Sequence, residues 1–129
     1  MVKYNVDRDE NALVEIRPLI ILESFDGDSY LELFQNETLR PILKLQHNIL
    51  IDFLLSQPKI ESVLKQKEIR RIFESKLKDY MNQPHLKGQL IGMVTGHFTN
   101  AEMKFYIKQS KDINKRIVQM LLQRFVDSF

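Results

Sequence analysis

The chain has 129 residues, of which 43% are hydrophobic and none is cysteine. This length fits one compact domain whose core needs no metal or disulfide to hold it together. The lack of cysteine excludes disulfides, thiol nucleophiles and cysteine-ligated zinc. No apolar run approaches the roughly 18 to 20 residues of a membrane span, and the N-terminus lacks the basic and apolar regions of a signal peptide. We therefore expect a cytoplasmic protein that makes no contact with a membrane.

The formal net charge of +2 conceals an asymmetry between the two ends of the chain. Residues 1–38 contain nine acidic and three basic residues, whereas residues 39–129 contain sixteen basic and eight acidic ones. An acidic arm and a basic body are electrostatically complementary. The arm is therefore expected to fold back on its own body or to lie across a second subunit; the alternative is that both are solvated surfaces.

Residues 1–28 are predicted to form an irregular acidic N-terminal arm. Pro18 disfavours helical backbone at Arg17, because the residue before a proline avoids the helical region. The short apolar run over 19–22 is expected to dock on the body as an extended or one-turn segment. The Asp-Gly-Asp sequence at 26–28 predicts a turn.

Residues 29–129 are predicted to form a helical domain, because capping signals and apolar residues at helical spacing alternate along them. Ser29 and Thr99 each begin a capping box, and Ser110 or Asp112 is expected to cap the last helix. Pro41 predicts either a kink or a helix that restarts at Thr38. The expected helices cover about 30–40, 42–55, 58–82 with a kink near residue 66, 84–98, 99–109 and 110–125. The sequence therefore predicts an all-α single domain, a bundle of five or six helices around one core.

Three of the four glycines, Gly88, Gly92 and Gly96, are spaced four residues apart. On a helix this spacing places them on one face, where another backbone can approach closely. Each glycine inside a helix costs about 1 kcal/mol relative to alanine. We therefore interpret the glycine stripe as a helix-packing surface, with a backbone that lines a ligand as the less favoured interpretation.

The sequence contains no recognisable catalytic or metal-binding motif. The three histidines lack the spacing of a metal site, and the glycines lack the lysine and the preceding strand of a phosphate-binding loop. Pairs of acidic residues occur in predicted turns, where local hydrogen bonding explains them. We predict no metal ion and no cofactor, and the sequence leaves open whether the protein is an enzyme.

The segment 35–46 is denser in hydrogen-bonding side chains than a helix junction requires. Gln46 shares a face with apolar residues, so it needs partners or loses about 1–3 kcal/mol. The favoured interpretation is a polar junction that fixes a kink at Pro41. The alternative is a site for a small polar or anionic ligand, with Arg40 contacting the anion. The candidate ligand-binding residues, including those expected from later segments, are Gln35, Asn36, Thr38, Arg40, Gln46, His97, Asn114 and Arg116.

Two segments, 34–51 (FQNETLRPILKLQHNILI) and 86–125 (LKGQLIGMVTGHFTNAEMKFYIKQSKDINKRIVQMLLQRF), resemble a family of short bacterial proteins of unassigned function. The shared elements are a QNxTLRPILKxQ segment, a GxxxGxFT corner and a closing helix with an Asn-Lys-Arg element, here residues 114–116. The resemblance covers about half the chain and implies which segments matter, but it implies no reaction. Some relatives carry a glyoxalase label. The β-α-β-β-β modules and His/Glu metal ligands of glyoxalases are not visible in this sequence.

Three functions follow from these patterns. The leading hypothesis is a non-enzymatic helical module that self-associates as a homodimer, based on the glycine stripe and the charge asymmetry. The second is a protein or enzyme that binds a small polar or anionic ligand, which requires segment 35–46 to meet His97 or residues 114–116 in one pocket. The third is a DNA-binding regulator that uses the helix-turn-helix-like segment 96–116. The modest positive charge and the acidic arm argue against a nucleic-acid partner.

Overall fold

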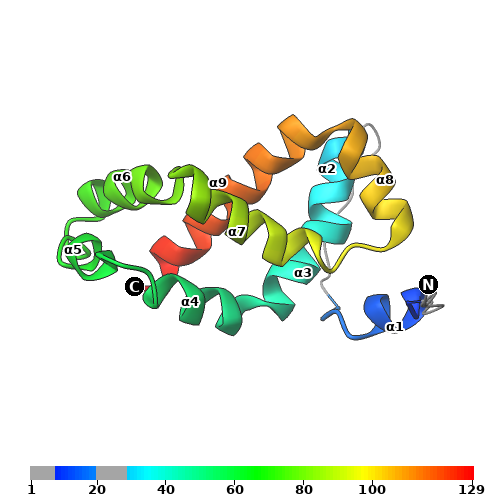
Figure 1. The fold of residues 1–129 in the computed structure, drawn as a ribbon, viewed down its shortest axis with the longest axis horizontal. Helices are drawn as coiled ribbons and strands as arrows, with labels where there is room; N and C mark the ends of the chain where they lie inside the picture. Colours follow the sequence, from blue (N-terminus) through cyan, green and yellow to red (C-terminus); the bar gives the residue numbers. More distant parts are fainter. Residues whose placement is uncertain (1–7, 20–28) are drawn as a thin grey trace, which may run out of the picture.

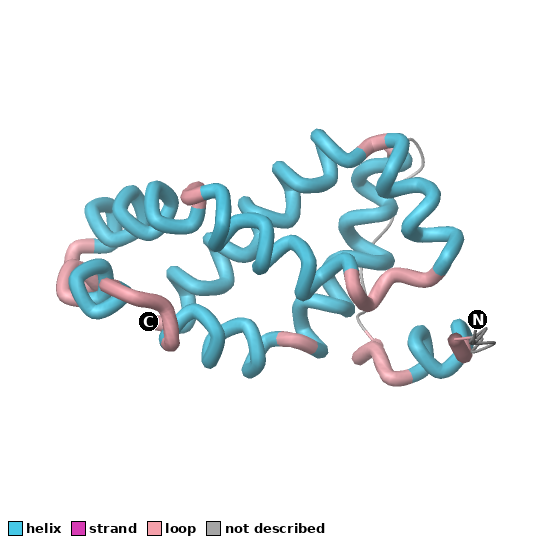
Figure 2. The backbone as a smooth tube through the Cα atoms, viewed as in Figure 1, coloured by secondary structure: helices cyan, strands magenta, loops and turns pink. Residues whose placement is uncertain are grey.

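The computed structural model describes residues 8–19 and 29–129, and in these ranges helices are joined by short loops and turns, with no strand (Figures 1 and 2). The predicted all-α class is therefore confirmed for the described residues. The predicted count of five or six helices is wrong, because several short helices follow one another across breaks of one or a few residues. No helix in the described ranges is both long enough and apolar enough to cross a membrane.

Part of the predicted irregular arm is a helix, α1 (Glu10–Glu15). Asp9 caps it, since its carboxylate accepts a hydrogen bond from the Ala12 backbone N–H at 3.0 Å. The helix ends before Pro18, as the backbone restriction at Arg17 predicts. The turn predicted over 26–28 lies outside the described residues. So does the apolar run over 19–22 except for Leu19, which is 88% exposed.

Residues 30–55 form one nearly continuous bent rod, which runs from cyan to green in Figure 1. We call it the rod; it consists of α2 (Tyr30–Phe34), the π-helical turn η1 (Gln35–Leu39), α3 (Arg40–Leu45) and α4 (His47–Leu55). Ser29 caps α2 as predicted, because its hydroxyl accepts from the Glu32 N–H at 3.1 Å. Gln46 alone separates α3 from α4.

The predicted helix restart at Thr38 does not occur. The rod instead passes through η1, in which the Arg40 N–H donates to the carbonyl oxygen of Gln35, five residues earlier. Pro41 explains the wider turn, because its ring crowds the carbonyl group four residues before it and it has no N–H to donate. A π turn relieves that crowding while the helix continues.

The predicted helix over 58–82 is divided into α5 (Ile60–Leu64) and α6 (Arg70–Met81), with a break close to the predicted kink at Gln66. The helix begins two residues later than Pro58, because Lys59 adopts a left-handed backbone conformation (φ 65°).

The last three helices follow with short connections. Pro84 opens α7 (Pro84–Thr95), and a complete capping box of Thr99 and Glu102 opens α8 (Asn100–Lys108). The last helix, α9 (Ser110–Ser128), starts without a side-chain cap, so the prediction for Ser110 and Asp112 is wrong. Only Gln109 separates α8 from α9, which leaves no loop in which a capping residue could lie.

The longest helix, α9, lies at the centre of the fold and packs against η1, α6, α7 and α8. Its residues Ile113, Ile117, Leu121 and Phe125 are fully buried at intervals of four. This spacing places them on one face of the helix, which forms the middle of the core. The opposite face of α9 does not pack into this core, so its side chains can line a groove on the surface.

The glycine stripe of α7 faces away from the core. All three glycines are exposed, and a Cβ atom added to Gly88 or Gly92 would meet no atom of the described chain within 4 Å. At Gly96 such an atom would meet only the Gly92 carbonyl oxygen of its own helix, at 3.1 Å. The helix packing predicted for Gly88, Gly92 and Gly96 is therefore not made by the described part of this chain.

Candidate functional site

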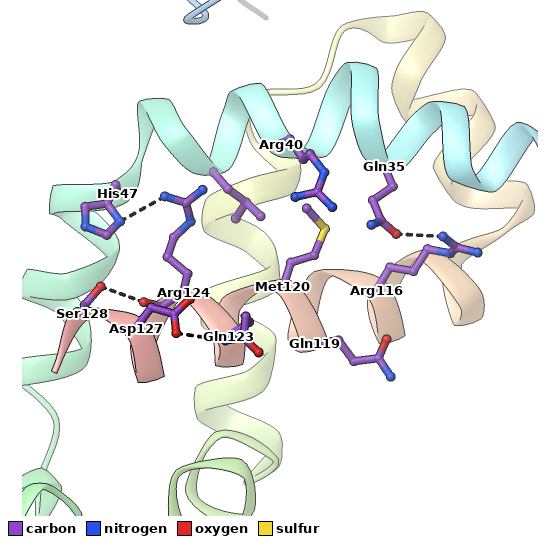
Figure 3. Close-up of a pocket in the computed structure, with 11 residues that line it drawn as sticks. Gln35, Arg40, His47, Arg116, Gln119, Met120, Gln123, Arg124, Asp127 and Ser128 are labelled. Carbon is purple, nitrogen blue, oxygen red and sulfur yellow. Dashed lines mark hydrogen bonds between the residues drawn. The ribbon is translucent and has the colours of Figure 1, made fainter. Parts of the chain in front are cut away.

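A groove of about 500 Å³ lies between the rod and α9 (Figure 3). Side chains from both elements point into it, and three of them are arginines. The rod contributes Gln35, Arg40, Leu43 and His47, and α9 contributes Arg116, Gln119, Met120, Gln123, Arg124, Asp127 and Ser128.

Helix geometry explains how these side chains meet. On α9, residues 116, 120 and 124 follow one another at intervals of four, so that their side chains share one face. On the rod, residues five apart in an α-helix would point about 140° apart. The π turn brings Gln35 into line with Arg40 because its hydrogen bond joins residues five apart. The turn thus aligns these two side chains toward the groove.

Each of the three groove arginines is oriented by a neutral acceptor. The Arg116 Nη1 donates to Gln35 Oε1 at 2.7 Å, and the Arg40 Nε donates to Asn36 Oδ1 at 3.0 Å. The Arg124 Nη1 contacts His47 Nδ1 at 3.2 Å. Since an arginine can only donate, a hydrogen bond between these two atoms requires His47 Nδ1 as the acceptor.

Positive charge in the groove is not neutralised. Among the described residues, no carboxylate forms an ion pair with Arg40, Arg116 or Arg124. The single acidic residue of the lining, Asp127, accepts a hydrogen bond from Gln123 at 3.0 Å and lies 3.9 Å from Arg70, outside the groove. Burial of the Arg124 guanidinium, together with the charge of Arg40, lowers the pKa of Arg124. Arg124 is therefore partly dehydrated and lies near the positive charge of Arg40.

The structure brings together some of the residues that the sequence singled out. Gln35, Arg40 and Arg116 line the groove, and Asn36 lies beside it. The other predicted residues lie elsewhere: Thr38 bonds to Glu102, His97 lies at the end of α7, Asn114 accepts from the Tyr106 hydroxyl, and Gln46 lies at the break between α3 and α4.

Sequence reasoning missed His47 and Arg124. The spacing of Arg116, Met120 and Arg124 was a signal that α9 has a second, partly basic face. Which helix this face would meet was not evident from spacing alone.

A second polar cluster joins the arm to the body. The Arg17 guanidinium donates to both Glu102 oxygens, at 2.8 Å and 2.9 Å, and its side chain is only 6% exposed. Glu102 also accepts from the Thr38 hydroxyl at 3.0 Å and from the Thr99 N–H at 2.8 Å. The Arg17 Nε is buried without a partner among the described residues. This cluster ties together the arm, the rod and α8.

The described part of the arm docks on its own chain through arginines rather than acids. Arg8 donates to the carbonyl oxygens of Gly96 and Phe98, both at 3.1 Å, and Arg17 donates to that of His97 at 2.7 Å. These carbonyls follow the C-terminus of α7, which carries partial negative charge. Glu10 contributes the one acidic contact, by accepting from the Asn100 N–H. These contacts therefore differ from the expected attraction between acidic residues of the arm and basic residues of the body.

Two groups at this junction have shifted pKa values. Burial alone would raise the pKa of Glu102, but hydrogen bonds from Arg17, Thr99 and Thr38 and the charge of Arg17 outweigh it, so the pKa falls below its ordinary value. Burial lowers the pKa of His97, and the charges of Arg17 and Arg8 lower it further. Both shifts disfavour protonation in the folded state.

The free energy of unfolding is therefore expected to fall in two steps on acidification. The unfolded chain binds more protons than the folded one below the ordinary His97 pKa of 6.5, and stability declines until the lower folded pKa is passed. Glu102 contributes stability that is present above its ordinary pKa of 4.5 and is lost as the pH falls through its folded pKa. Urea unfolding at a series of pH values measures both steps.

The first step is assigned by substitution of a single histidine. His97→Gln should remove it and leave the Glu102 step in place, whereas His85→Gln, at an exposed position, should change neither. A first step of unaltered size in His97→Gln would show that another group causes it.

The described residues contain no group of three or more histidine, cysteine, aspartate or glutamate side chains that could hold a metal ion. Charged side chains gather with defined geometry in the arginine-lined groove and at the arm junction. Their interpretation rests on that geometry, since comparison with protein-family models, curated protein sequences and solved structures finds no match to this chain.

Proposed function

We propose that the protein binds an anion in the groove between the rod and α9. The observation that carries this proposal is the set of three arginines, Arg40, Arg116 and Arg124, which in the described part of the chain are held by amide and imidazole groups rather than by carboxylates. Bringing like charges together costs free energy, and a bound anion offsets that cost. The planar guanidinium group also matches carboxylate and phosphate oxygens in a two-pronged arrangement.

Arg17, an arginine with a structural role in the same chain, has a different kind of acceptor from the groove arginines. Arg17 is buried against the carboxylate of Glu102, which neutralises its charge, and it also donates to the backbone carbonyl of His97. The groove arginines face the amides of Gln35 and Asn36 and the ring of His47 instead. Neutral acceptors orient a guanidinium without cancelling its charge, so its interaction with a ligand stays strong.

Titration calorimetry with inorganic phosphate and pyrophosphate, at ionic strength held constant with sodium chloride, tests the proposal. Arg124→Gln is expected to weaken binding about 10- to 100-fold, which corresponds to the loss of one charge-assisted hydrogen bond. Arg71→Gln, an exposed arginine on α6 outside the groove, is the matched control. Heat changes that are the same in phosphate and in chloride would contradict the proposal, as would equal weakening in the two variants.

Self-association, the leading hypothesis from the sequence, stays a prediction. Exposure of the glycine stripe on α7 favours it, because the cost of Gly88 and Gly92 inside the helix is not offset by packing against the described residues, while Gly96 is the C-cap. Light scattering at tens of micromolar decides it, since a monodisperse monomer would exclude the dimer. The DNA-binding hypothesis is less favoured, because Arg8, Glu10 and Arg17 occupy the corner between α7 and α8.

A further inference from the structure

The three groove arginines follow one another along the groove in the order Arg116, Arg40, Arg124. On α9, Arg116 and Arg124 are separated by a rise of about 12 Å along the helix axis. Figure 3 shows the Arg40 guanidinium between them, where it reaches from the rod to the side of Met120. We call these three side chains the arginine row. Cations occupy both of its ends and its middle.

An aspartate lies beyond each end of the arginine row. Asp112 is one helical turn before Arg116 on α9, and it lines a neighbouring cavity of about 370 Å³ that Arg116 also lines. Lys115 lines this cavity too, so positive and negative charges offset each other there. At the other end, Asp127 follows Arg124 by three residues and lines the groove. The positive charge that lacks a carboxylate partner is therefore confined to the row itself.

A row of adjacent cations matches a chain of adjacent anionic groups better than it matches one small ion. A single orthophosphate or carboxylate that binds at one end leaves the arginine at the other end without an anionic partner. Phosphates joined by anhydride bonds place anionic groups next to one another, with no uncharged carbon segment between them. Each phosphate also has the pair of oxygens that a planar guanidinium group contacts in its two-pronged arrangement.

From this arrangement we infer that the ligand is a short linear oligophosphate, whose consecutive phosphates bind along the arginine row. The aspartates beyond the row disfavour a longer chain, because its outer phosphates would meet carboxylates. The same chemistry is present in a free inorganic oligophosphate and in the phosphate chain of a nucleotide. This inference rests on the proposed function, because it specifies the ligand of the same groove.

The first test is titration calorimetry of the wild-type protein with orthophosphate, pyrophosphate, tripolyphosphate and longer linear oligophosphates. Ionic strength is held constant and divalent cations are left out. Tripolyphosphate should bind about tenfold or more tightly than orthophosphate, the effect of at least one added charge-assisted hydrogen bond. Affinity should then level off once the chain covers the row. This series does not depend on whether any variant folds.

A substitution at one end of the row tests whether the phosphates follow it. Arg116→Gln should weaken tripolyphosphate binding about tenfold or more and orthophosphate binding by less. Lys111→Gln is the matched control, because it removes the same charge from the same helix at an exposed position outside both cavities. It should leave the affinities for both compounds unchanged.

Removal of a carboxylate beyond the row tests what limits the chain length. Asp112→Asn should raise the affinity for the longer oligophosphates and leave that for tripolyphosphate unchanged. Asp79→Asn, at an exposed position on α6, makes the same change in charge away from the row and should alter neither affinity.

Adenosine triphosphate, compared with tripolyphosphate, separates the two sources of the phosphate chain. Tighter binding of the nucleotide assigns the chain to a nucleotide, and equal or weaker binding assigns it to a free oligophosphate.

Failure of this inference is distinguishable from failure of the proposed function. If orthophosphate binds but longer chains bind no more tightly, the oligophosphate is wrong, while the anion-binding groove stands. Equal weakening of tripolyphosphate binding by Arg116→Gln and Lys111→Gln would also overturn the oligophosphate, because general attraction between opposite charges would then explain the series. If no phosphate compound binds, the proposed function fails as well.

Discussion

Replacing Glu102 with alanine is expected to lower the free energy of unfolding by about 3–5 kcal/mol. The substitution leaves the Arg17 guanidinium, at 6% exposure, without the carboxylate that it contacts through two nitrogens. A buried charge without its partner costs more than the pair itself contributes, because the charge has lost water and here keeps only the neutral His97 carbonyl as an acceptor. The Thr38 hydroxyl and the Thr99 N–H lose their acceptor as well.

Urea unfolding of Glu102→Ala measures this loss, with Glu37→Ala, at an exposed position on η1, as the control. The double variant Arg17→Met with Glu102→Ala should lose less than the sum of the two single variants, because it removes the charge together with its partner. Additive losses would show that Arg17 and Glu102 contribute independently, contrary to the geometry.

Replacing Phe98 with alanine is expected to lower the free energy of unfolding by a similar amount, about 3–5 kcal/mol. The ring is 1% exposed and meets the rings of Phe34 and Tyr106 edge-on, at interplanar angles of 81° and 63° and with centroids 5.5 Å and 5.6 Å away. Alanine removes these aromatic contacts and leaves a cavity between the rod and α8. The backbone carbonyl that Arg8 contacts is retained, so the experiment isolates the ring.

Thermal and urea unfolding of Phe98→Ala provide the measurement. Ile107→Ala is the matched control on α8, since Ile107 is 66% exposed and its truncation should cost less than about 0.5 kcal/mol. A loss at Phe98 as small as that of the control would mean that the surrounding side chains collapse into the cavity.

The parts of the fold that were predictable depend on local chemistry. Ser29 and Thr99 start helices because their hydroxyls accept from nearby backbone N–H groups, and Pro84 suits a first helical turn. The helix α1 was missed because a helix of six residues is too short to be stable on local interactions alone. Its position is fixed by contacts that Arg8 and Arg17 make with residues about 80 to 90 positions later in the chain.

The candidate site was predictable only in part, for a geometric reason. Gln35 and Arg40 were predicted because they belong to the polar segment 35–46. Arg116 was predicted because it belongs to the Asn-Lys-Arg element. His47 and Arg124 are recognisable only when the rod and α9 are known to run side by side in the same direction. The pairs Gln35 with Arg116 and His47 with Arg124 establish that alignment. Helical spacing assigns a residue to a face, but it does not identify the helix opposite that face.

The π turn amounts to one extra residue in an otherwise regular α-helix. It shifts the phase of the rod by about 100° between the half that carries Phe34 and the half that carries His47. A chain with one residue fewer before Pro41 could keep the same arginines, glutamine and histidine and still present them in different directions. The number of residues between Gln35 and His47 therefore constrains the groove as strictly as their identities. Chains that share this groove are best sought by that interval.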